Sequence, residues 1–333
     1  MEMTPVQIDL GIKVARSLDK IIFKSKKFNM TDTVLIAGTP RAGTTWLMEI
    51  LGTIPDYTYL FEPLNPIWYP ESRELGFRSR KYLPSDTDWP EGEDYLRKIF
   101  TGGLVGFQSL YQITPKAITR LLLSNKLIVK SVRLNRLLPW IVKRFQLRRI
   151  FFIIRHPCAV VASQFKTGFC GYHNTFSPYA NIFPTLEHVL DEASKIDSLK
   201  PGLLNKLKHI KTKEEILAAV WCLDNYVPLS LPKPQPWTIV TYEKLVKRGR
   251  EEMTHLFNEL GEKDIPQSAF QHLRIPSMLA PGRLAPGDDL EMILKAEEQL
   301  SKWKKFLSDK QIERILNVVS DFGIDFYTEY SES

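Results

Sequence analysis

The chain has 333 residues, of which 44% are hydrophobic and 25% are charged, so it can bury a sizeable core and is not a disordered or low-complexity protein. Its formal net charge is +7 and its pI is near 9.1, which suits an anionic ligand; no nucleic-acid-binding motif accompanies this charge, so nucleic acid is not an expected partner. No stretch approaches 18 uninterrupted apolar residues, and the sequence therefore predicts no membrane-spanning helix.

In chain order, the first predicted element is a basic amphipathic helix in residues 1–28, with its helical part over 6–24. It either docks on the rest of the domain or lies peripherally on a membrane or a partner. Strands and helices then alternate. The expected strands are 33–37, 58–61, 127–131, 149–154 and 237–241, and the expected helices are 45–54, 93–100, 114–123, 135–146, 157–166, 213–229, 250–260, 289–307 and 309–320.

This alternation predicts a single α/β domain over residues 1–333. We expect a P-loop-like three-layer fold, with a central parallel sheet of about four to five strands flanked by helices. Two long excursions, 62–94 and 168–212, interrupt the alternation. Ligands bind such sheets beyond the carboxyl ends of the strands, so motifs at those ends are the candidates for a site.

The first such motif is Thr39-Pro40-Arg41-Ala42-Gly43-Thr44-Thr45-Trp46, between a predicted strand and a predicted helix. A small-residue loop at a helix N-terminus offers free backbone N–H groups and the positive end of the helix dipole, which together hold a phosphate. Gly38 and Gly43 have the spacing of the P-loop motif, but Thr44 stands where that motif requires lysine. This argues against a nucleoside triphosphate, with an ordinary β–α turn as the alternative.

The second motif follows the apolar run 149–154, where Arg155-His156-Pro157 opens a helix. Ser163 comes eight residues after Arg155, just over two helical turns. Arginine offers a planar fork for a phosphate and serine offers a hydroxyl donor. A surface ion pair and a tolerated helix serine are the simpler alternatives for the two residues taken singly.

Together these motifs resemble those of sulfotransferases that use 3′-phosphoadenosine 5′-phosphosulfate (PAPS). The usual loop there reads T-Y-P-K-S-G-T-T-W; here Arg41 replaces lysine and Ala42 replaces serine. Arginine at this position is common in the carbohydrate-sulfating branch. The resemblance implies that Arg41 steadies the leaving group. It also implies that the loop residues Ala42, Gly43, Thr44 and Thr45 hold the 5′-phosphate and that Trp46 packs on the adenine.

The resemblance assigns Arg155 and Ser163 to the 3′-phosphate. Tyr242, in the segment Ile239–Leu245, resembles a family tyrosine near the adenine, although a tyrosine at the rim of the sheet is an equal alternative. Arg283 is the candidate for the family's loop over the 3′-phosphate, with Ser277 as a second candidate and a solvated loop arginine as the alternative.

A general base is also expected. The phenol-sulfating branch has K-T-H after its second main strand, but here the stretch is Lys130-Ser131-Val132-Arg133. Attention therefore moves to Glu62, since the carbohydrate branch uses a glutamate at a similar place; a glutamate paired with a nearby Lys or Arg is the alternative. Lys130 is expected near the sulfuryl oxygens. His173 is the second candidate for the base.

The resulting hypothesis is an enzyme that transfers a sulfuryl group from PAPS to a hydroxyl or amine of a small-molecule or carbohydrate acceptor, with the two excursions shaping the acceptor pocket. No metal is expected, and family members often pair, so a homodimer is open. A P-loop kinase or NTPase and a non-catalytic nucleotide-binding scaffold are the alternatives. The uneven cysteines, Cys158, Cys170 and Cys222, favour a cytoplasmic protein, with a lumenal domain as the alternative.

Overall fold

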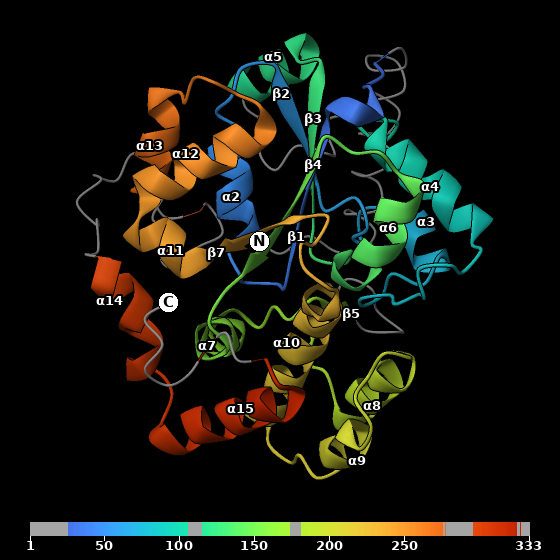
Figure 1. Ribbon diagram of the computed structural model, residues 1–333, viewed down its shortest axis with the longest axis vertical. Helices are drawn as coiled ribbons and strands as arrows, with labels where there is room; N and C mark the ends of the chain where they lie inside the picture. Colours follow the sequence, from blue (N-terminus) through green and yellow to red (C-terminus); the bar gives the residue numbers. More distant parts are fainter. Residues whose placement is uncertain are drawn as a thin grey trace, which may run out of the picture.

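The first strand, β1 (Thr33–Gly38), is buried along its whole length and pairs with a parallel strand on each side. In this computed structural model, residues 26–105, 115–173, 181–275, 277, 296–324 and 327 are described. The sheet has five parallel strands in the order β2-β3-β1-β4-β7 (Figure 1). The other four strands are β2 (Tyr57–Phe61), β3 (Lys126–Ser131), β4 (Arg149–Ile154) and β7 (Thr238–Thr241). The predicted fold class is thus confirmed.

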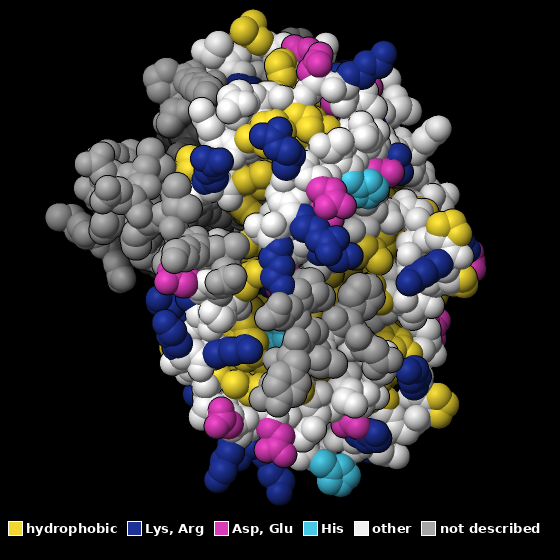
Figure 2. All heavy atoms as spheres, turned by 60° about the vertical axis from the view of Figure 1, so that its left-hand side comes forward, with side chains coloured by type: hydrophobic (Ala, Val, Ile, Leu, Met, Phe, Trp, Pro, Cys, Tyr) yellow, Lys and Arg dark blue, Asp and Glu magenta, His cyan; other side chains and the backbone are white. Residues whose placement is uncertain are grey.

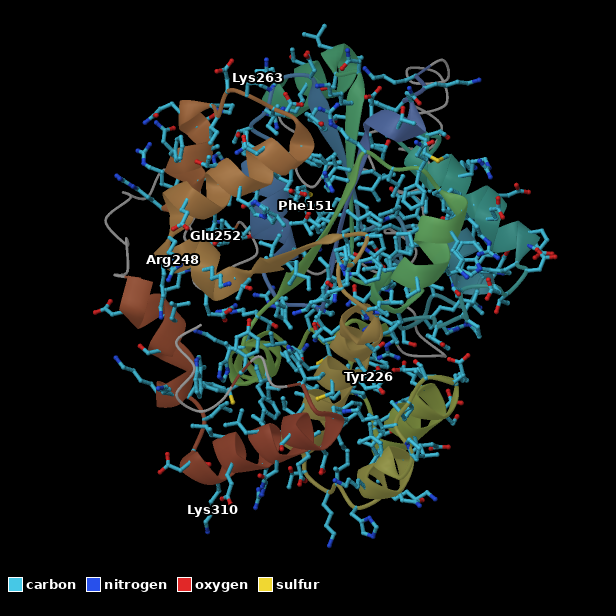
Figure 3. All side chains as sticks on the ribbon, viewed as in Figure 1. Phe151, Tyr226, Arg248, Glu252, Lys263 and Lys310 are labelled. Carbon is cyan, nitrogen blue, oxygen red and sulfur yellow. The ribbon has the colours of Figure 1, made fainter. Side chains whose placement is uncertain are left out.

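Alternate side chains of the central strands enter two different cores, as the period of a strand requires. Val34 and Ile36 pack with α2 (Thr44–Leu51) and α12 (Gly249–Leu260). Leu35 and Ala37 pack with α4 (Pro90–Phe100) and α6 (Leu138–Arg144) on the opposite face. Figure 1 shows these two helical layers to the left and right of the sheet. Phe151 of β4 accordingly lies in the interior, whereas Lys310 projects outward (Figure 3).

A third core lies beyond one end of the sheet, in the lower part of Figure 1. It is built by α7 (Pro157–Thr167), α10 (Lys213–Ser230) and α15 (Asp309–Phe322). The excursion predicted over 168–212 packs on this core and contains α8 (Leu186–Ser194), α9 (Leu203–Leu207) and the short antiparallel pair β5 (Tyr172–His173) and β6 (Asn181–Ile182).

The prediction of a helix over 135–146 is wrong for the first turn. Asn135–Leu137 form a 3₁₀ turn, η3, and α6 begins only at Leu138. Pro139 explains this, because proline lacks the N–H of an interior helical bond and is accepted in the first turn.

The remaining helices are short, and most of them were not predicted. They are η1 (Met30–Asp32), α3 (Pro70–Glu74), α5 (Pro115–Leu123, predicted), α11 (Tyr242–Lys247) and α13 (Gln267–Leu273). Within the helix predicted over 289–307, the described part forms α14 (Ala296–Ser301) and η4 (Lys302–Lys305), and 289–295 lie outside the described residues. The N-terminal helix predicted over 6–24 lies outside them too.

A buried ionic network ties the first excursion to the third core. Asp224 of α10 accepts from Arg80 at 2.9 Å and from Arg136 at 2.9 Å, and Arg136 also donates to Glu192 at 2.8 Å. Burial alone would lower the pKa of Arg136, but the Glu192 and Asp224 carboxylates outweigh burial and raise it. Arg136 therefore stays charged, and the network fixes the 62–94 excursion beside the carboxyl end of the sheet.

Replacing Asp224 with alanine should cost about 3–5 kcal/mol of unfolding free energy, because two buried guanidinium groups lose their shared acceptor. Urea unfolding measures this loss. Asp191→Ala is the control, since its pair with Lys195 is largely exposed and should contribute about 0–1 kcal/mol. Equal losses in the two variants would contradict the structural role given to the network.

Candidate active site

The carboxyl ends of neighbouring strands are in register, which brings four chain segments together. Gly38 at the end of β1 pairs with Ile153, Ala37 pairs with Ser131, and Phe61 at the end of β2 pairs with Lys130. Both sequence motifs begin at these carboxyl ends, as predicted. The site therefore forms where the loop after β1, the ends of β2 and β3 and the turn after β4 converge.

The loop after β1 has a strained backbone. Arg41 adopts φ +76 and Gly43 adopts φ +104, both in the left-handed region that costs a non-glycine residue about 1–2 kcal/mol. The N–H of Ala42 donates to the Thr39 carbonyl at 2.9 Å and closes the turn. Gly43 is the N-cap of α2 and supplies no side-chain cap, which leaves the N–H groups of the first turn for another acceptor.

Side chains from three other elements support this loop from behind. Asn135 accepts from the N–H of Gly38 at 3.0 Å, Gln164 donates to the Pro40 carbonyl at 3.2 Å, and Asn225 donates to the Thr39 hydroxyl at 3.2 Å. All three supporting side chains are buried. Sequence reasoning missed them, because amides in helices carry no motif of their own.

The two sequence motifs meet through direct hydrogen bonds. Arg41 Nε donates to the Ser163 hydroxyl at 3.0 Å, and Arg155 Nη1 donates to the Arg41 carbonyl at 3.2 Å. The Arg155 guanidinium also lies 4.1 Å from the centre of the Tyr242 ring, a distance that gives a cation–π contact. Arg41, Arg155, Ser163 and Tyr242 thus form one cluster around the first turn of α2.

The aromatic residues Trp46 and Tyr242 stand beside each other, with ring centres 5.2 Å apart. Trp46 Nε1 donates to the His272 carbonyl at 2.9 Å, and Gln299 donates to the Tyr242 hydroxyl at 2.6 Å. Tyr242 also lies close to Gly43, where a Cβ would come within 2.7 Å of the ring. Both rings are buried and line one side of the loop between β1 and α2.

Glu62 lies directly after β2 with φ +47, and its N–H donates to the Lys130 carbonyl at 2.9 Å. Its side chain turns toward β3. Oε1 accepts from Lys130 Nζ at 2.5 Å, and the N–H of Val132 lies 3.3 Å from both carboxylate oxygens. The carboxylate is thus buried and paired with a lysine, the alternative that the sequence left open.

The neighbouring cations are buried as well. Burial lowers the pKa of Lys130, and the positive charges of Arg133 and Arg41 add to this, although the Glu62 carboxylate opposes it. Burial also lowers the pKa of Arg133, to about 10, so this side chain stays protonated at neutral pH. Three cations around one carboxylate leave an excess of positive charge, which favours a bound anion.

Two predicted residues cannot be placed in this arrangement. His173 belongs to β5, where its backbone pairs with Asn181, but its side chain lies outside the described residues. Arg283 lies outside the described residues altogether.

One acidic residue of the site was not predicted. Glu243, next to Tyr242, accepts from the His156 N–H at 2.9 Å and from the Tyr327 hydroxyl at 2.8 Å. Burial raises the pKa of Glu243, against the lowering effect of the His156 N–H and Arg155. The His156 ring stacks on Trp303 at 4.7 Å. These contacts fix the turn that carries Arg155.

Basic side chains surround the site at the surface. The face with α11, α12 and α14, to the left in Figure 1, comes forward in Figure 2 and carries many Lys and Arg side chains. Lys244, Lys247 and Lys302 are exposed there. Such a face attracts a polyanion.

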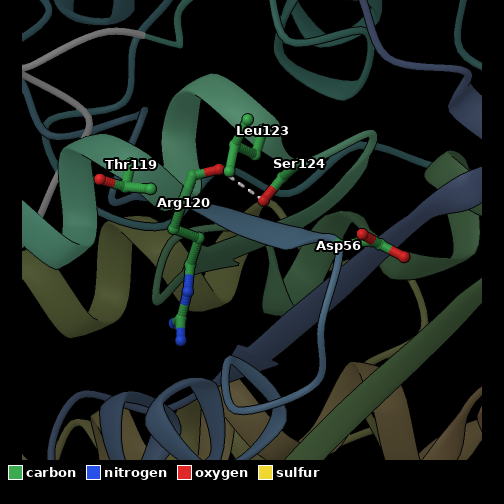
Figure 4. A pocket seen from close by; sticks show the side chains of 5 residues that line it. All are labelled: Asp56, Thr119, Arg120, Leu123 and Ser124. Atoms are coloured by element: carbon green, nitrogen blue, oxygen red, sulfur yellow. Dashed lines mark hydrogen bonds between the residues drawn. The ribbon is translucent and has the colours of Figure 1, made fainter.

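A shallow hollow elsewhere is not part of the site. It is lined by Asp56, Thr119, Arg120, Leu123 and Ser124, and Ser124 donates to the Arg120 carbonyl at 2.6 Å (Figure 4). Asp56 precedes β2 and Ser124 precedes β3, so this hollow is at the amino ends of the strands. It therefore lies at the opposite end of the strands from the loop after β1.

Over the described part of the chain, no helix is both long and apolar enough to span a bilayer, and no three His, Cys, Asp or Glu side chains are grouped to hold a metal ion. The three cysteines are buried and unbridged.

The loop after β1 and the Arg155–Ser163 motif thus meet at the carboxyl end of a parallel α/β sheet, where such sheets bind their ligands. A sequence profile described as "Sulfotransferase family" matches residues 33–200, just over half of the chain. The chain belongs to the sulfotransferase family. No curated protein sequence matches it.

Solved structures with a similar fold include the sulfotransferase domain of the Synechococcus PCC 7002 olefin synthase, with 16% identity, 90% of this chain and 96% of that chain covered, and a TM-score of 0.42. Mouse sulfotransferase SULT7A1 complexed with PAP has 14% identity, coverage of 93% and 89%, and a TM-score of 0.45. Retinol dehydratase in complex with androsterone and inactive cofactor PAP has 15% identity, coverage of 96% and 88%, and a TM-score of 0.42.

Gly43→Ala should destabilise the protein more than Gly202→Ala. Both glycines have positive φ, +104 and +83, so both alanines cost about 1–2 kcal/mol of backbone strain. Only the alanine at position 43 meets a neighbour, the Tyr242 ring, whereas nothing lies within 4 Å at position 202. Overpacking should add about 1–3 kcal/mol, measured by urea unfolding, and equal losses would show that Gly43 is needed only for its backbone conformation.

Proposed function

We propose that this protein transfers a sulfuryl group from PAPS to a hydroxyl or amine of a small-molecule or carbohydrate acceptor, releasing 3′-phosphoadenosine 5′-phosphate (PAP). The observation that carries the proposal is the meeting of two anion-binding motifs through Arg41, Ser163 and Arg155. They supply donors for two phosphates in one cluster. PAPS has one phosphate on the 3′ oxygen and one on the 5′ oxygen of its ribose, so it would contact both motifs.

The donor would lie along the first turn of α2. The N–H groups from Ala42 to Thr45 and the two threonine hydroxyls bind its 5′-phosphate. Arg155 and Ser163 bind its 3′-phosphate, and the loop with Arg283 adds to that contact. Trp46 and Tyr242 border the adenine, supported by their burial and mutual packing beside the loop.

In the reaction, the acceptor oxygen or nitrogen forms a bond to sulfur while the bond from sulfur to the phosphate oxygen breaks. PAP leaves with the electron pair of that bond. Arg41 stabilises the charge on the departing phosphate, and Lys130 lies near the sulfuryl oxygens. By analogy with phosphoryl transfer, positioning and charge stabilisation dominate such a step.

The acceptor proton passes to Glu62. This assignment is supported by the place of the carboxylate after β2, in the same cluster as Lys130 and two strands from the phosphate-binding loop. Among the described residues, its Oε2 has a long contact from the Val132 N–H and a 3.5 Å ion pair with Arg133, both weaker than the bond to Oε1, so it keeps room for a proton. His173 is the alternative base, since its backbone follows the turn at Gly171, whose Cβ would lie 2.9 Å from Pro40 of the loop.

The two excursions, 62–94 and 168–212, would shape the acceptor pocket. We place the protein in the cytoplasm, with a lumenal location as the alternative, because its three thiols are unbridged, as in a reducing compartment.

The proposal is tested by thermal shift with PAP and with ATP and Mg²⁺, followed by mass detection of sulfated products from PAPS and an acceptor panel. Stabilisation by PAP and formation of sulfated product are expected. Stabilisation by ATP alone would favour a kinase or NTPase. Stabilisation by PAP with no product from any acceptor would favour a non-catalytic scaffold.

Glu62→Gln should lower kcat about 10²–10⁴-fold, because the variant keeps the side-chain shape but cannot take the proton. PAP should still raise the melting temperature of the variant, which serves as the control for folding. His173→Ala is compared in the same assay. If His173→Ala lowers kcat more than Glu62→Gln does, the base is His173 and the assignment of Glu62 is wrong.

A further inference from the structure

Arg133 is a buried cation that contacts the proposed base, Glu62. It lies two residues beyond β3, and none of its side chain is exposed. Its Nη1 is 3.5 Å from Oε2 of Glu62, and its Nη2 donates to the Gly171 carbonyl at 3.3 Å. Nε and Nη1 have no hydrogen-bond partner among the described residues. Because unfilled buried donors cost stability, packing alone does not account for an arginine here.

The two oxygens of Glu62 are held unequally. Oε1 takes the 2.5 Å bond from Lys130, whereas Oε2 has only the 3.3 Å contact with the Val132 N–H and the ion pair with Arg133. Oε2 is therefore the oxygen better suited to accept a proton. Among the described residues, Arg133 is the side chain that contacts this oxygen.

The opposite side of Arg133 contacts the turn at the start of the second excursion. Gly171 has φ +83, and a Cβ there would lie 2.9 Å from Pro40. Arg80 Nη1 donates to the Cys170 carbonyl at 3.0 Å. The Cys170–Gly171 turn is thus held between the phosphate-binding loop, Arg80 and Arg133.

We propose that Arg133 is a positioning residue that holds Oε2 of Glu62 in place for proton transfer and links this carboxylate to the Cys170–Gly171 turn. Arg133 then holds the base at a fixed position relative to the second excursion, which is expected to shape the acceptor pocket. This inference rests on the proposed function, in which Glu62 is the base.

Charged groups from three parts of the chain face the pair. Lys130 and Arg133 contact the carboxylate, Arg41 acts on Lys130 from the phosphate-binding loop, and Arg80 faces Arg133 from the first excursion. All four are cations. Loss of the Arg133 charge would remove the ion pair to Oε2 and leave only Oε1 held by a side chain, so the carboxylate would be free to turn.

The test uses Arg133→Met, which keeps the length without the charge, and Arg133→Lys, which keeps the charge without the fork. The carboxyl ¹³C chemical shift of Glu62 is recorded by NMR on protein labelled with ¹³C-glutamate, and its signal is assigned from the Glu62→Gln spectrum. The kcat and the KM for PAPS are measured in parallel. Arg136→Lys is the matched control, because Arg136 is equally buried but binds Asp224 and Glu192 instead.

In Arg133→Met, the carboxyl ¹³C shift of Glu62 should change, because Oε2 loses its ion pair. The kcat should fall at least tenfold, roughly the weight of one misplaced catalytic group, with the KM for PAPS unchanged. Arg133→Lys should restore the ¹³C shift but only part of kcat, since lysine cannot reach both Glu62 and Gly171. Arg136→Lys should lower stability and leave the Glu62 ¹³C shift unchanged.

A folded Arg133→Met protein with an unchanged Glu62 ¹³C shift would overturn the inference. If Arg133→Met does not fold, Arg133→Lys decides: a reduced kcat with an unchanged ¹³C shift supports the inference, and full kcat overturns it. The NMR measurement needs no substrate. Absence of sulfuryl transfer by the unmodified protein would therefore count against the proposed function, while the ¹³C shift still decides whether Arg133 positions the carboxylate.

Discussion

The site depends on one constraint, the left-handed backbone of the loop between β1 and α2. A non-glycine residue at φ +76 persists only where its surroundings hold it there. The carbonyl of Arg41 accepts from Arg155, and that of Pro40 accepts from Gln164, so both carbonyls are turned toward the protein. The N–H groups at the start of α2 are left for a ligand.

Charge is the second theme of the structure, and it serves two purposes. Asp224 and Glu192 neutralise Arg80 and Arg136, and this network fastens the first excursion to the third core. Beside it, Lys130 and Arg133 both pair with Glu62, and the positive charge of Arg41 acts on Lys130. The first cluster has its charges balanced and stabilises the fold. The second has an excess of positive charge, which a bound sulfate and phosphate would neutralise.

Much of the fold could be predicted because its central strands are continuous apolar runs. The strand at Arg149–Ile154 was located without error, and that at Thr33–Gly38 to within one residue. Short helices were missed for a physical reason: one or two turns carry too little periodicity to be recognised. Helix α8 is an example, since its capping box uses His188 where Glu or Gln is the usual signal.

The sequence by itself determined the strands of the sheet and the two motifs that follow them, and it named Arg41, Arg155, Ser163 and Glu62 as candidates, because these features are local in the chain. Only the tertiary structure decided which of them meet. Arg41 and Ser163 lie 122 positions apart and Glu62 and Arg133 lie 71 apart, yet parallel strands in register bring each pair within contact. No local pattern marks the buried partners Gln164, Asn225 and Arg133. Their roles come from the packing of α7, α10 and the end of β3 around the carboxyl end of the sheet.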